Sequence, residues 1–299
     1  MVKGLVSKIQ HYSTKDGPGI RTTVFMMGCN LRCKWCANPE NLLHKPQVFY
    51  FKERCKHCGL CVQYASNHSI TFDEVGCKIN RKTCDNLLDM VDLCPYDAYE
   101  LIGKEYTVDE LVKVLLKDKE FYESSGGGVT FSGGEAALQK EFIVEVAKQL
   151  KQHNIHVCLD TAGLISTDSM RELLEVVDLV LFDIKSMDSN VHKKCTEVSN
   201  ERIVENFKIV SVPTIVRMVV VPTYNDSLDD IKKRIDFVST YGKYVLQVDV
   251  LKYHIFGIGK YEKLGMEYPI KETLENDNQL IDEIVSYGNS LGLKVTIGG

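Results

Sequence analysis

Short apolar runs alternate with helical segments after residue 105, and this alternation limits the fold more than any other feature of the chain. The runs that predict strands are residues 129–132, 155–160, 179–183, 214–221, 244–251 and 294–297, with an earlier one at 22–27. Helices are predicted near residues 138–152, 168–176, 200–210, 228–241 and 278–291, and a capping box of Thr107 and Glu110 starts another. Strands that alternate with helices indicate βα units and a parallel sheet. The sequence therefore predicts an α/β protein, a partial (β/α)6-type barrel with its chemistry at the carboxyl ends of the strands.

Residues 46–103 interrupt this alternation. They hold six of the eleven cysteines, and helical periodicity is weak among them. We predict that they form a small inserted domain, and that residues 1–45 and 104–299 together build the barrel. Farther along the chain, the three glycines at 126–128 predict a flexible lead-in to the strand that follows them.

Nine of the eleven cysteines lie between Cys29 and Cys94, and this crowding needs an explanation. The first residues contain no apolar run long enough for a signal peptide, and no later stretch could span a membrane, so we expect a cytoplasmic protein with no membrane partner. Disulfides are disfavoured in that reducing compartment, so clustered thiols indicate metal binding. The net charge of −5 makes a broad electrostatic contact with nucleic acid unfavourable, and we expect no nucleic acid partner.

The motif with the strongest chemical signal is Cys29-Asn-Leu-Arg-Cys33-Lys-Trp-Cys36, a C-x3-C-x2-C spacing in the loop after the predicted strand at 22–27. Three thiolates on one short loop can hold three irons of a [4Fe–4S] cubane and leave the fourth iron open for a chelating substrate. The alternatives are a zinc site that lacks one ligand, or unrelated core cysteines. Zinc sites favour paired C-x2–4-C units with a distant second pair, and this spacing fits them poorly.

This spacing, with the aromatic Trp35 before the third cysteine, resembles the signature of the radical S-adenosylmethionine (SAM) superfamily. The preceding Asp16-Gly-Pro-Gly-Ile-Arg21, joined to residues 22–36, is similar to the N-terminal signature of glycyl-radical-enzyme activating enzymes, the family that includes pyruvate formate-lyase activating enzyme. The resemblance continues at residues 132–135, 159–163, 182–185, 217–222 and 252–254, so it covers nearly the whole chain.

The resemblance implies a specific reaction. SAM binds the open iron of a reduced [4Fe–4S] cluster through its amino and carboxylate groups, and one electron cleaves a carbon–sulfur bond to leave a 5′-deoxyadenosyl radical. That radical takes a hydrogen from the α-carbon of one glycine in a partner, a glycyl radical enzyme. The implied electron donor is a flavodoxin or a ferredoxin-type protein, and the implied setting is anaerobic. The cofactor carries the hard chemistry while the protein positions, shields and tunes it.

The resemblance also assigns residues to the site. Those that it places at the cofactor are Trp35, Gly133, Gly134, Glu135, Asp160, Thr161, Asp183, Ile184, Lys185 and His254, and those that it places in catalysis are Asp16, Lys185 and Arg217. It implies that Asp160 and Asp183 face SAM with a monovalent cation beside them, and that Asp16 lies near the incoming glycine loop. From the residues alone, two aspartates that end hydrophobic strands need a ligand, a partner or a helix to cap.

The insert carries two runs that fit the spacing of two-cluster ferredoxins, C-x2-C-x2-C-x3-C-P, in which the fourth cysteine of each run binds the other run's cluster. The first run has Cys55, Cys58 and Cys61 with Ala65 in the fourth position, and the second has Cys84, Leu87, Met90 and Cys94, followed by Pro95. The two runs together predict a ferredoxin-like insert built as a degenerate duplication.

The exchange of fourth ligands decides how many clusters this insert can hold. One cluster receives the complete set of Cys55, Cys58, Cys61 and Cys94. The other would receive a single thiolate, from Cys84, because Leu87 and Met90 are predicted core residues, and Cys77 could not complete the set. We therefore predict one auxiliary [4Fe–4S] cluster, with zinc or no metal as the alternatives.

Two other classes of function remain open on the sequence. One is a radical SAM enzyme that acts on a small molecule or on a different peptide, and the other is a non-catalytic iron–sulfur electron-transfer protein. The auxiliary-cluster insert is absent from the simplest pyruvate formate-lyase activators. Its presence favours a dehydratase, a decarboxylase or another lyase as the partner.

Overall fold

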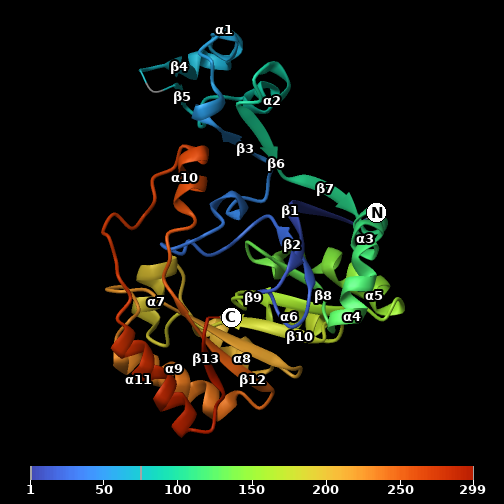
Figure 1. Ribbon diagram of the computed structural model, residues 1–299, viewed down its shortest axis with the longest axis vertical. Helices are drawn as coiled ribbons and strands as arrows, with labels where there is room; N and C mark the ends of the chain where they lie inside the picture. The colour runs from blue at the N-terminus through green and yellow to red at the C-terminus, as the bar shows by residue number, and fades with distance from the viewer. Residues whose placement is uncertain (1, 75, 299) are drawn as a thin grey trace.

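The computed structural model describes residues 2–74 and 76–298 and is built around one nine-stranded sheet (Figure 1). In order across the sheet, the strands are β13 (Val295–Ile297), β12 (Val245–Lys252), β11 (Thr214–Val220), β10 (Leu179–Asp183), β9 (His156–Thr161), β8 (Gly128–Gly133), β2 (Arg21–Met26), β1 (Lys3–Ser13) and β7 (Lys104–Thr107). Every neighbouring pair from β13 to β2 is parallel, whereas β1 is antiparallel to both of its neighbours. No pairing joins β13 to β7 in the described part of the chain, so the barrel is open.

The α/β class and the partial barrel predicted from the sequence are confirmed, and each predicted strand boundary lies within one residue of the observed one. The sequence does not predict β1 or β7. These two strands pair residues 3–6 with residues 104–107, on opposite sides of the insert, and no local pattern reports so distant a partner.

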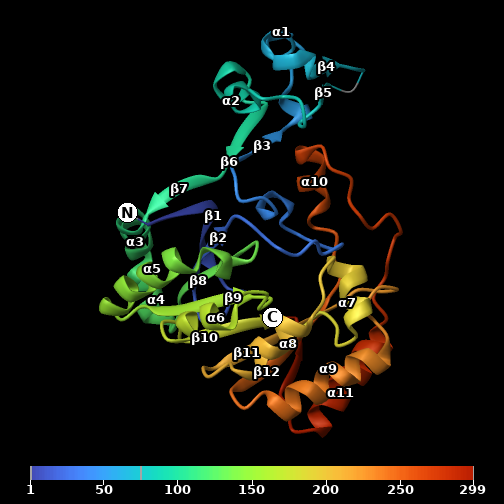
Figure 2. The ribbon, with the colours of Figure 1, turned by 180° about the vertical axis from the view of Figure 1, so that it is seen from behind.

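Helices cover the outer face of the sheet and bury one continuous hydrophobic core against it (Figure 2). They are α3 (Val108–Leu115), α4 (Lys119–Ser125), α5 (Lys140–Gln152), α6 (Thr167–Leu174), α8 (Glu201–Lys208), α9 (Leu228–Tyr241) and α11 (Asn278–Ser290). The predicted capping box starts α3, where the Glu110 N–H donates to the Thr107 hydroxyl and the Thr107 N–H donates to the Glu110 carboxylate. A further helix, α7 (Ser189–Thr196), is not predicted by the sequence. Short 3-10 helices lie at Pro39–Asn41, Lys52–Arg54, Ser66–His68, Leu87–Asp89, Leu116–Asp118 and Ala136–Gln139.

The inner face of the barrel is apolar along the first part of its strands and charged where they end. Cys158, Leu179 and Leu181 belong to a small buried cluster inside the first part. Toward the carboxyl ends, β9 presents Asp160 and β10 ends at Asp183. Because the strands are parallel, these charges meet at one edge of the sheet, and that edge carries the candidate site.

Gly127 and Gly128 are closely packed, and the flexible lead-in predicted for residues 126–128 is wrong at these two positions. A Cβ on Gly127 would lie 1.8 Å from the carbonyl oxygen of Ile20, and one on Gly128 would lie 2.0 Å from that of His156. Only glycine fits where backbones pass this closely. The run is therefore a tight crossing that brings the start of β8 between β2 and β9.

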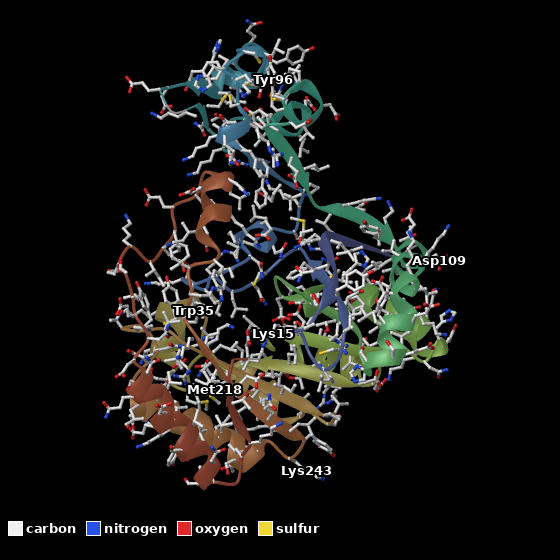
Figure 3. The ribbon with its side chains drawn as sticks, viewed as in Figure 1. Lys15, Trp35, Tyr96, Asp109, Met218 and Lys243 are labelled. Carbon is white, nitrogen blue, oxygen red and sulfur yellow. The ribbon has the colours of Figure 1, made fainter. Side chains whose placement is uncertain are left out.

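Residues 47–102 form a group of short elements at one end of the molecule (Figure 1). The elements are β3 (Gln47–Tyr50), α1 (Leu60–Tyr64), β4 (Ile70–Phe72), β5 (Cys77–Ile79), α2 (Met90–Leu93) and β6 (Tyr99–Ile102). β3 pairs with β6 and β4 pairs with β5, in both cases antiparallel. Tyr96 in this group and Trp35 in the barrel lie far apart (Figure 3).

A short helix, α10 (Ile258–Leu264), connects this group to the barrel. Its last residue, Leu264, packs against Phe49 and Phe51 of the insert. The Arg81 side chain of the insert donates to the carbonyl oxygen of Lys263 at 2.9 Å. In both ribbon views α10 lies between the insert and the barrel (Figures 1 and 2).

Candidate active site

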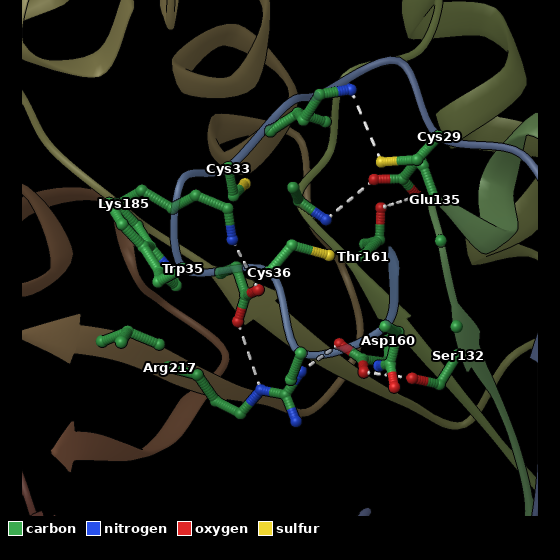
Figure 4. Close-up of a pocket in the computed structure, with 18 of the residues that line it drawn as sticks. Cys29, Cys33, Trp35, Cys36, Ser132, Glu135, Asp160, Thr161, Lys185 and Arg217 are labelled. Carbon is green, nitrogen blue, oxygen red and sulfur yellow. Dashed lines mark hydrogen bonds and ion pairs between the residues drawn. The ribbon is translucent and has the colours of Figure 1, made fainter. Parts of the chain in front are cut away.

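Three cysteines converge on one pocket at the carboxyl ends of the barrel strands (Figure 4). Cys29, Cys33 and Cys36 all line it, from the loop that follows β2. Burial raises the pKa of Cys29 and of Cys36 to about 11 and that of Cys33 to about 12. The three thiols are therefore protonated at neutral pH in the absence of metal, and iron binding must release their protons.

The cysteine loop, residues 27–36, is held from behind by the end of α7. The carbonyl oxygen of Cys195 accepts from the backbone N–H of Lys34 at 3.0 Å, and that of Thr196 accepts from the N–H of Arg32 at 2.8 Å. Carbonyl groups in the last turn of a helix have no partner within the helix, and here the loop satisfies them. The thiol-bearing backbone is thus anchored by hydrogen bonds that need no metal.

Trp35 and Tyr253 form an apolar wall of the pocket. Both side chains are buried in a small core cluster that also contains Cys195 and Val221. The sequence assigns Trp35 to the site but does not single out Tyr253. Its position directly before His254, at the end of β12, is the signal that could have found it.

Gly133 and Gly134, at the end of β8, pack closely against the backbone of β2 and of the cysteine loop. Gly133 has a φ of +110°, and a Cβ there would lie 2.5 Å from the backbone nitrogen of Met26. A Cβ on Gly134 would lie 2.2 Å from the carbonyl oxygen of Gly28. Both glycines line the pocket, and both are required because the two backbones pass so close together.

Glu135 follows these glycines and cross-links two strand ends. Its carboxylate accepts from the Thr161 hydroxyl at 2.6 Å and from the backbone N–H of Ala162 at 2.9 Å. Burial raises the pKa of Glu135 to about 7, although these hydrogen bonds lower it. The residue lines the pocket and at the same time fixes the end of β9 to the end of β8.

Two carboxylates and two cations lie together on the floor of the pocket (Figure 4). Arg217 bridges the pair, with its guanidinium donating to Asp160 and, at 3.2 Å, to Asp183. Lys185 donates to the second Asp183 oxygen at 2.7 Å. Ser132 donates to Asp160 at 2.6 Å. The sequence does not assign Ser132 to the site, although this residue ends the predicted strand at 129–132, directly before the glycine pair.

The pairing sets the protonation of these buried groups. Burial raises the pKa of Asp183, but Lys185 and Arg217 outweigh it and hold that pKa below its ordinary value. Asp160 faces only one of the cations, and burial raises its pKa despite Arg217. The pKa of Lys185 and that of Arg217 lie above their ordinary values, because the carboxylates outweigh burial. The floor thus offers both signs of charge to a ligand.

Asp16 and Ile184 lie outside the pocket lining. The Asp16 carboxylate accepts from the Thr23 hydroxyl at 2.6 Å, in the loop between β1 and β2, and its charge raises the pKa of Arg217. Ile184 is buried in the main core, and its side chain does not line the pocket. Asp16 therefore acts on the floor of the site from a distance, whereas Ile184 supports it by packing.

His254 lines the rim of the pocket, where its ring stacks on Phe256 with ring centroids 4.4 Å apart. Burial lowers the pKa of His254, so the imidazole is neutral at pH 7. Phe256 itself is 83% exposed. Its Nδ1 accepts from the backbone N–H of Phe256 at 3.4 Å, so the neutral ring has its Nε2–H left to donate.

A second cavity, in the insert, gathers the four cysteines predicted to hold an auxiliary cluster. They are Cys55, Cys58, Cys61 and Cys94, and all four line it. Across residues 2–74 and 76–298, no three His, Cys, Asp or Glu side chains converge closely enough for a single metal ion. Each thiolate of a cubane binds a different corner, so its ligands surround a space rather than a point.

The rest of the second ferredoxin run fills the core of the insert. Met90 is fully buried there, Leu87 packs beside it, and Cys84 is buried in the same cluster. None of the three lines the cavity. This is the arrangement predicted for a run that has lost its own cluster.

Cys77 has a position that the sequence does not predict, because its Sγ lies 3.6 Å from the Sγ of Cys61. Hydrogen bonding from Cys77 lowers the pKa of Cys61 to about 6, and the pKa of Cys77 rises well above its ordinary value for the same reason. Tyr99 lies beside both thiols, where burial raises its pKa. Its hydroxyl is buried and has no hydrogen-bond partner among the described residues.

A family model described as the radical SAM superfamily matches residues 23–238, a span that includes the cysteine loop and most of the pocket lining. The chain belongs to the radical SAM superfamily. It is 38% identical to the choline trimethylamine-lyase activating enzyme of Oleidesulfovibrio alaskensis, over 90% of this chain and 89% of that relative. It is 36% identical to the trans-4-hydroxy-L-proline dehydratase activating enzyme of Clostridioides difficile, over 99% of both chains.

Solved structures agree with this assignment. A domain of the pyruvate-formate lyase-activating enzyme from Bacteroides vulgatus is 29% identical, with a TM-score of 0.50, and covers 58% of this chain and 100% of that one. Streptococcus suis SuiB bound to its precursor peptide SuiA shares the fold, with a TM-score of 0.53 and 14% identity over 91% of this chain and 47% of that one. The chain is a radical SAM activating enzyme of glycyl radical enzymes, the family predicted from its sequence.

The residues of the pocket fit the two groups that the superfamily binds, a [4Fe–4S] cluster and SAM. Three thiols on one loop supply ligands for three irons. Opposite them, the floor offers carboxylates to an ammonium and cations to a carboxylate, as the methionyl end of SAM requires. Within residues 2–74 and 76–298, no helix is both long enough and apolar enough to cross a lipid bilayer.

Proposed function

We propose that this enzyme abstracts one hydrogen from the α-carbon of a single glycine in a partner protein, using the pocket bounded by the cysteine loop. When bound, the cluster and SAM supply a 5′-deoxyadenosyl radical. The protein's own role is to hold the cluster and SAM in a fixed relative orientation, to exclude water and to admit one peptide loop. The observation that carries the proposal is the convergence of all three motif thiols and four paired charges on one pocket.

In this proposal each group of residues has a separate role. Cys29, Cys33 and Cys36 hold the cluster. The main chain at residues 133–134 and the Glu135 carboxylate orient the amino end of SAM. The paired charges of the pocket floor hold its carboxylate, and Trp35, Thr161 and His254 line the space for the rest of the molecule. Lys185 and Arg217 also present positive charge to the incoming peptide.

A monovalent cation beside SAM is part of the proposal. Asp160 and Asp183 share a single guanidinium, and a cation that entered between them would release Arg217 toward the peptide. SAM affinity should then depend on potassium or sodium at constant ionic strength. If SAM bound equally well when tetramethylammonium replaced potassium and sodium, the cation site would be contradicted. The other roles proposed for the pocket would be unaffected.

We further propose that residues 46–103 form a separate ferredoxin-like unit with one auxiliary [4Fe–4S] cluster, and that a flavodoxin or ferredoxin-type protein supplies the electron. Support for the cluster comes from four thiols around one cavity and from the partnerless hydroxyl of Tyr99 on its wall. A buried hydroxyl without a partner is costly, and a cluster sulfur would satisfy it.

The partner that we propose is a glycyl radical dehydratase, decarboxylase or lyase. Relatives of similar length activate choline trimethylamine-lyase, 4-hydroxyphenylacetate decarboxylase and trans-4-hydroxy-L-proline dehydratase. The direct test combines the anaerobically reconstituted enzyme, SAM, a reductant and the partner, and records the glycyl radical by electron paramagnetic resonance. SAM cleavage that proceeds with no radical on any glycyl radical enzyme, but with a modified small molecule, would favour the alternative radical SAM chemistry.

Asp183→Asn should weaken SAM binding by about tenfold, or ~1.4 kcal/mol. The amide cannot balance Lys185 and Arg217, which then repel each other across the floor of the pocket. The measurement is anaerobic equilibrium binding of SAM to the cluster-loaded variant. Asp168→Asn, at an exposed carboxylate on α6, is the matched control and should bind SAM normally. Unchanged affinity in Asp183→Asn would remove this residue from the SAM site.

Asp16→Asn should separate partner activation from SAM chemistry. The amide oxygen can still accept from Thr23, so the loop keeps its hydrogen bond while the charge facing Arg217 is lost. SAM cleavage without partner should stay within about twofold, whereas the rate of glycyl radical formation should fall about tenfold or more. Thr23→Val, which removes the hydrogen bond but keeps the charge, is the control for a loop effect. Equal loss of both activities in Asp16→Asn would place the residue in the cofactor site or in the fold.

A further inference from the structure

The Cys77 thiol is too close to Cys61 to be a ligand of the auxiliary cluster proposed above. Each iron of a cubane accepts one protein thiolate, and the four thiolates point away from four different corners. Two sulfur atoms 3.6 Å apart are in van der Waals contact and cannot occupy two corners. Cys77 also lies outside the lining of the cavity formed by Cys55, Cys58, Cys61 and Cys94.

The backbone fixes Cys77 in this place. Its N–H donates to the Tyr50 hydroxyl at 3.0 Å, and the Tyr50 ring lies 5.2 Å from the ring of Tyr99, centroid to centroid. Gly76 precedes it with a φ of +146°, and a Cβ there would lie 2.9 Å from the Tyr50 oxygen. The backbone of Cys77 is therefore positioned by β5 and by its hydrogen bond to Tyr50, which packs against Tyr99.

Tyr99 supplies the second, independent observation. It is 4% exposed, lines the same cavity, and its hydroxyl has no hydrogen-bond partner among the described residues. The hydroxyl lies beside the Cys61 and Cys77 sulfur atoms, close enough to interact with both thiols but without a hydrogen bond of ordinary geometry. Thiolate and sulfide atoms of a cluster are acceptors, and they would satisfy it.

We infer that Cys77 and Tyr99 are hydrogen-bond donors to the sulfur atoms of the auxiliary cluster, Cys77 through its S–H to the Cys61 thiolate and Tyr99 through its O–H. This inference rests on the proposed auxiliary cluster and adds its tuning. Donors to cluster sulfurs stabilise the reduced state, which carries the extra negative charge, and so raise the reduction potential. Neither residue ligates iron, so both act as positioning and tuning residues.

The test uses the full-length chain with Cys29→Ala, Cys33→Ala and Cys36→Ala, so that only the auxiliary cluster remains. Cys77→Ala and Tyr99→Phe are each added to this background, and the midpoint potential is measured by a redox titration followed by electron paramagnetic resonance. Both variants should shift the potential to more negative values, with iron unchanged at about four per chain. Cys77→Ser replaces the S–H donor by an O–H donor, so its midpoint potential should lie close to that of the starting background.

Matched controls remove a thiol or a hydroxyl nearby without touching the contact. Cys84→Ala removes another buried thiol of the insert, and Tyr64→Phe changes an exposed ring of the insert that does not line the cavity. Neither should move the potential. An unchanged potential in both Cys77→Ala and Tyr99→Phe would overturn the inference.

Other results would overturn it in distinguishable ways. Loss of iron from Cys77→Ala would make Cys77 a ligand. Zinc in place of iron would make Cys61 and Cys77 a pair on one tetrahedral ion, for which a 3.6 Å separation is also suitable. Absence of any metal from the starting background would overturn the auxiliary cluster itself, while SAM cleavage by the unsubstituted enzyme would leave the rest of the proposed function standing.

Discussion

Cys33→Ala should reduce the cleavage of SAM to 5′-deoxyadenosine to the background of the assay. Cys33 is one of three thiols on the pocket wall, and its loss leaves one iron of the cluster without a protein ligand. Cys29 and Cys36, on which the charge of Lys185 also acts, would remain but cannot replace the missing ligand. The experiment is anaerobic reconstitution followed by chromatography of 5′-deoxyadenosine, with iron and sulfide determined on the same sample.

Cys195→Ala is the matched control for that variant. Its thiol is also buried and lies in the cluster of Trp35, and its backbone carbonyl, which accepts from Lys34 of the cysteine loop, is kept by the substitution. Cleavage should remain within a few-fold of the unsubstituted rate. A Cys33→Ala protein that still produced 5′-deoxyadenosine at nearly that rate would refute the assignment of the motif.

Cys94→Ala should lower the iron content from about eight to about four per chain, while SAM binding persists. Cys94 belongs to the second run but lines the cavity of the first, so its loss removes one of four thiolates. The pocket proposed to bind SAM lies in the barrel, and none of the insert cysteines lines it. Iron and sulfide analysis, with SAM binding measured in parallel, tests both halves of the expectation.

Cys84→Ala provides the comparison within the same run. Cys84 is buried in the core of the insert, beside Met90, and lies outside the cavity. Its substitution should leave the iron content near eight. A count near twelve in the unsubstituted protein, or loss of a cluster from the Cys84 variant, would show that the second ferredoxin run also holds a cluster.

The barrel could be predicted from the sequence because each of its parallel strands is a local apolar run between helices. β1 and β7 could not, because they form one antiparallel pairing across the whole insert and their residues are half polar. At Gly127 and Gly128 the predicted flexible lead-in is wrong for a related reason. Glycine signals either freedom or close contact, and only the carbonyl oxygens of Ile20 and His156 distinguish the two.

The candidate site was predictable where a motif carries it and unpredictable where side chains from separate strands pair. Asp160, Asp183 and Lys185 are visible as charged residues at strand ends, but the bridge that Arg217 makes between the two carboxylates depends on the spacing of β9, β10 and β11. In the insert, ligand spacing predicted which cysteines share a cavity. The contact of Cys77 with Cys61 depends on a turn and a hairpin that no spacing rule describes.

The helix α10 has a consequence for the distance between the two groups of thiols. At its start, a Cβ on Gly257 would lie 2.9 Å from the carbonyl oxygen of Cys36, and the Lys260 side chain donates to Glu40 at 2.6 Å. At its end, Leu264 and Lys263 contact the insert. The insert is thus attached at three places, through the chain entering β3, the chain leaving β6 and this helix. This third attachment restrains rotation about the two connecting segments, and it therefore limits how far the two sets of sulfur atoms can move apart or together.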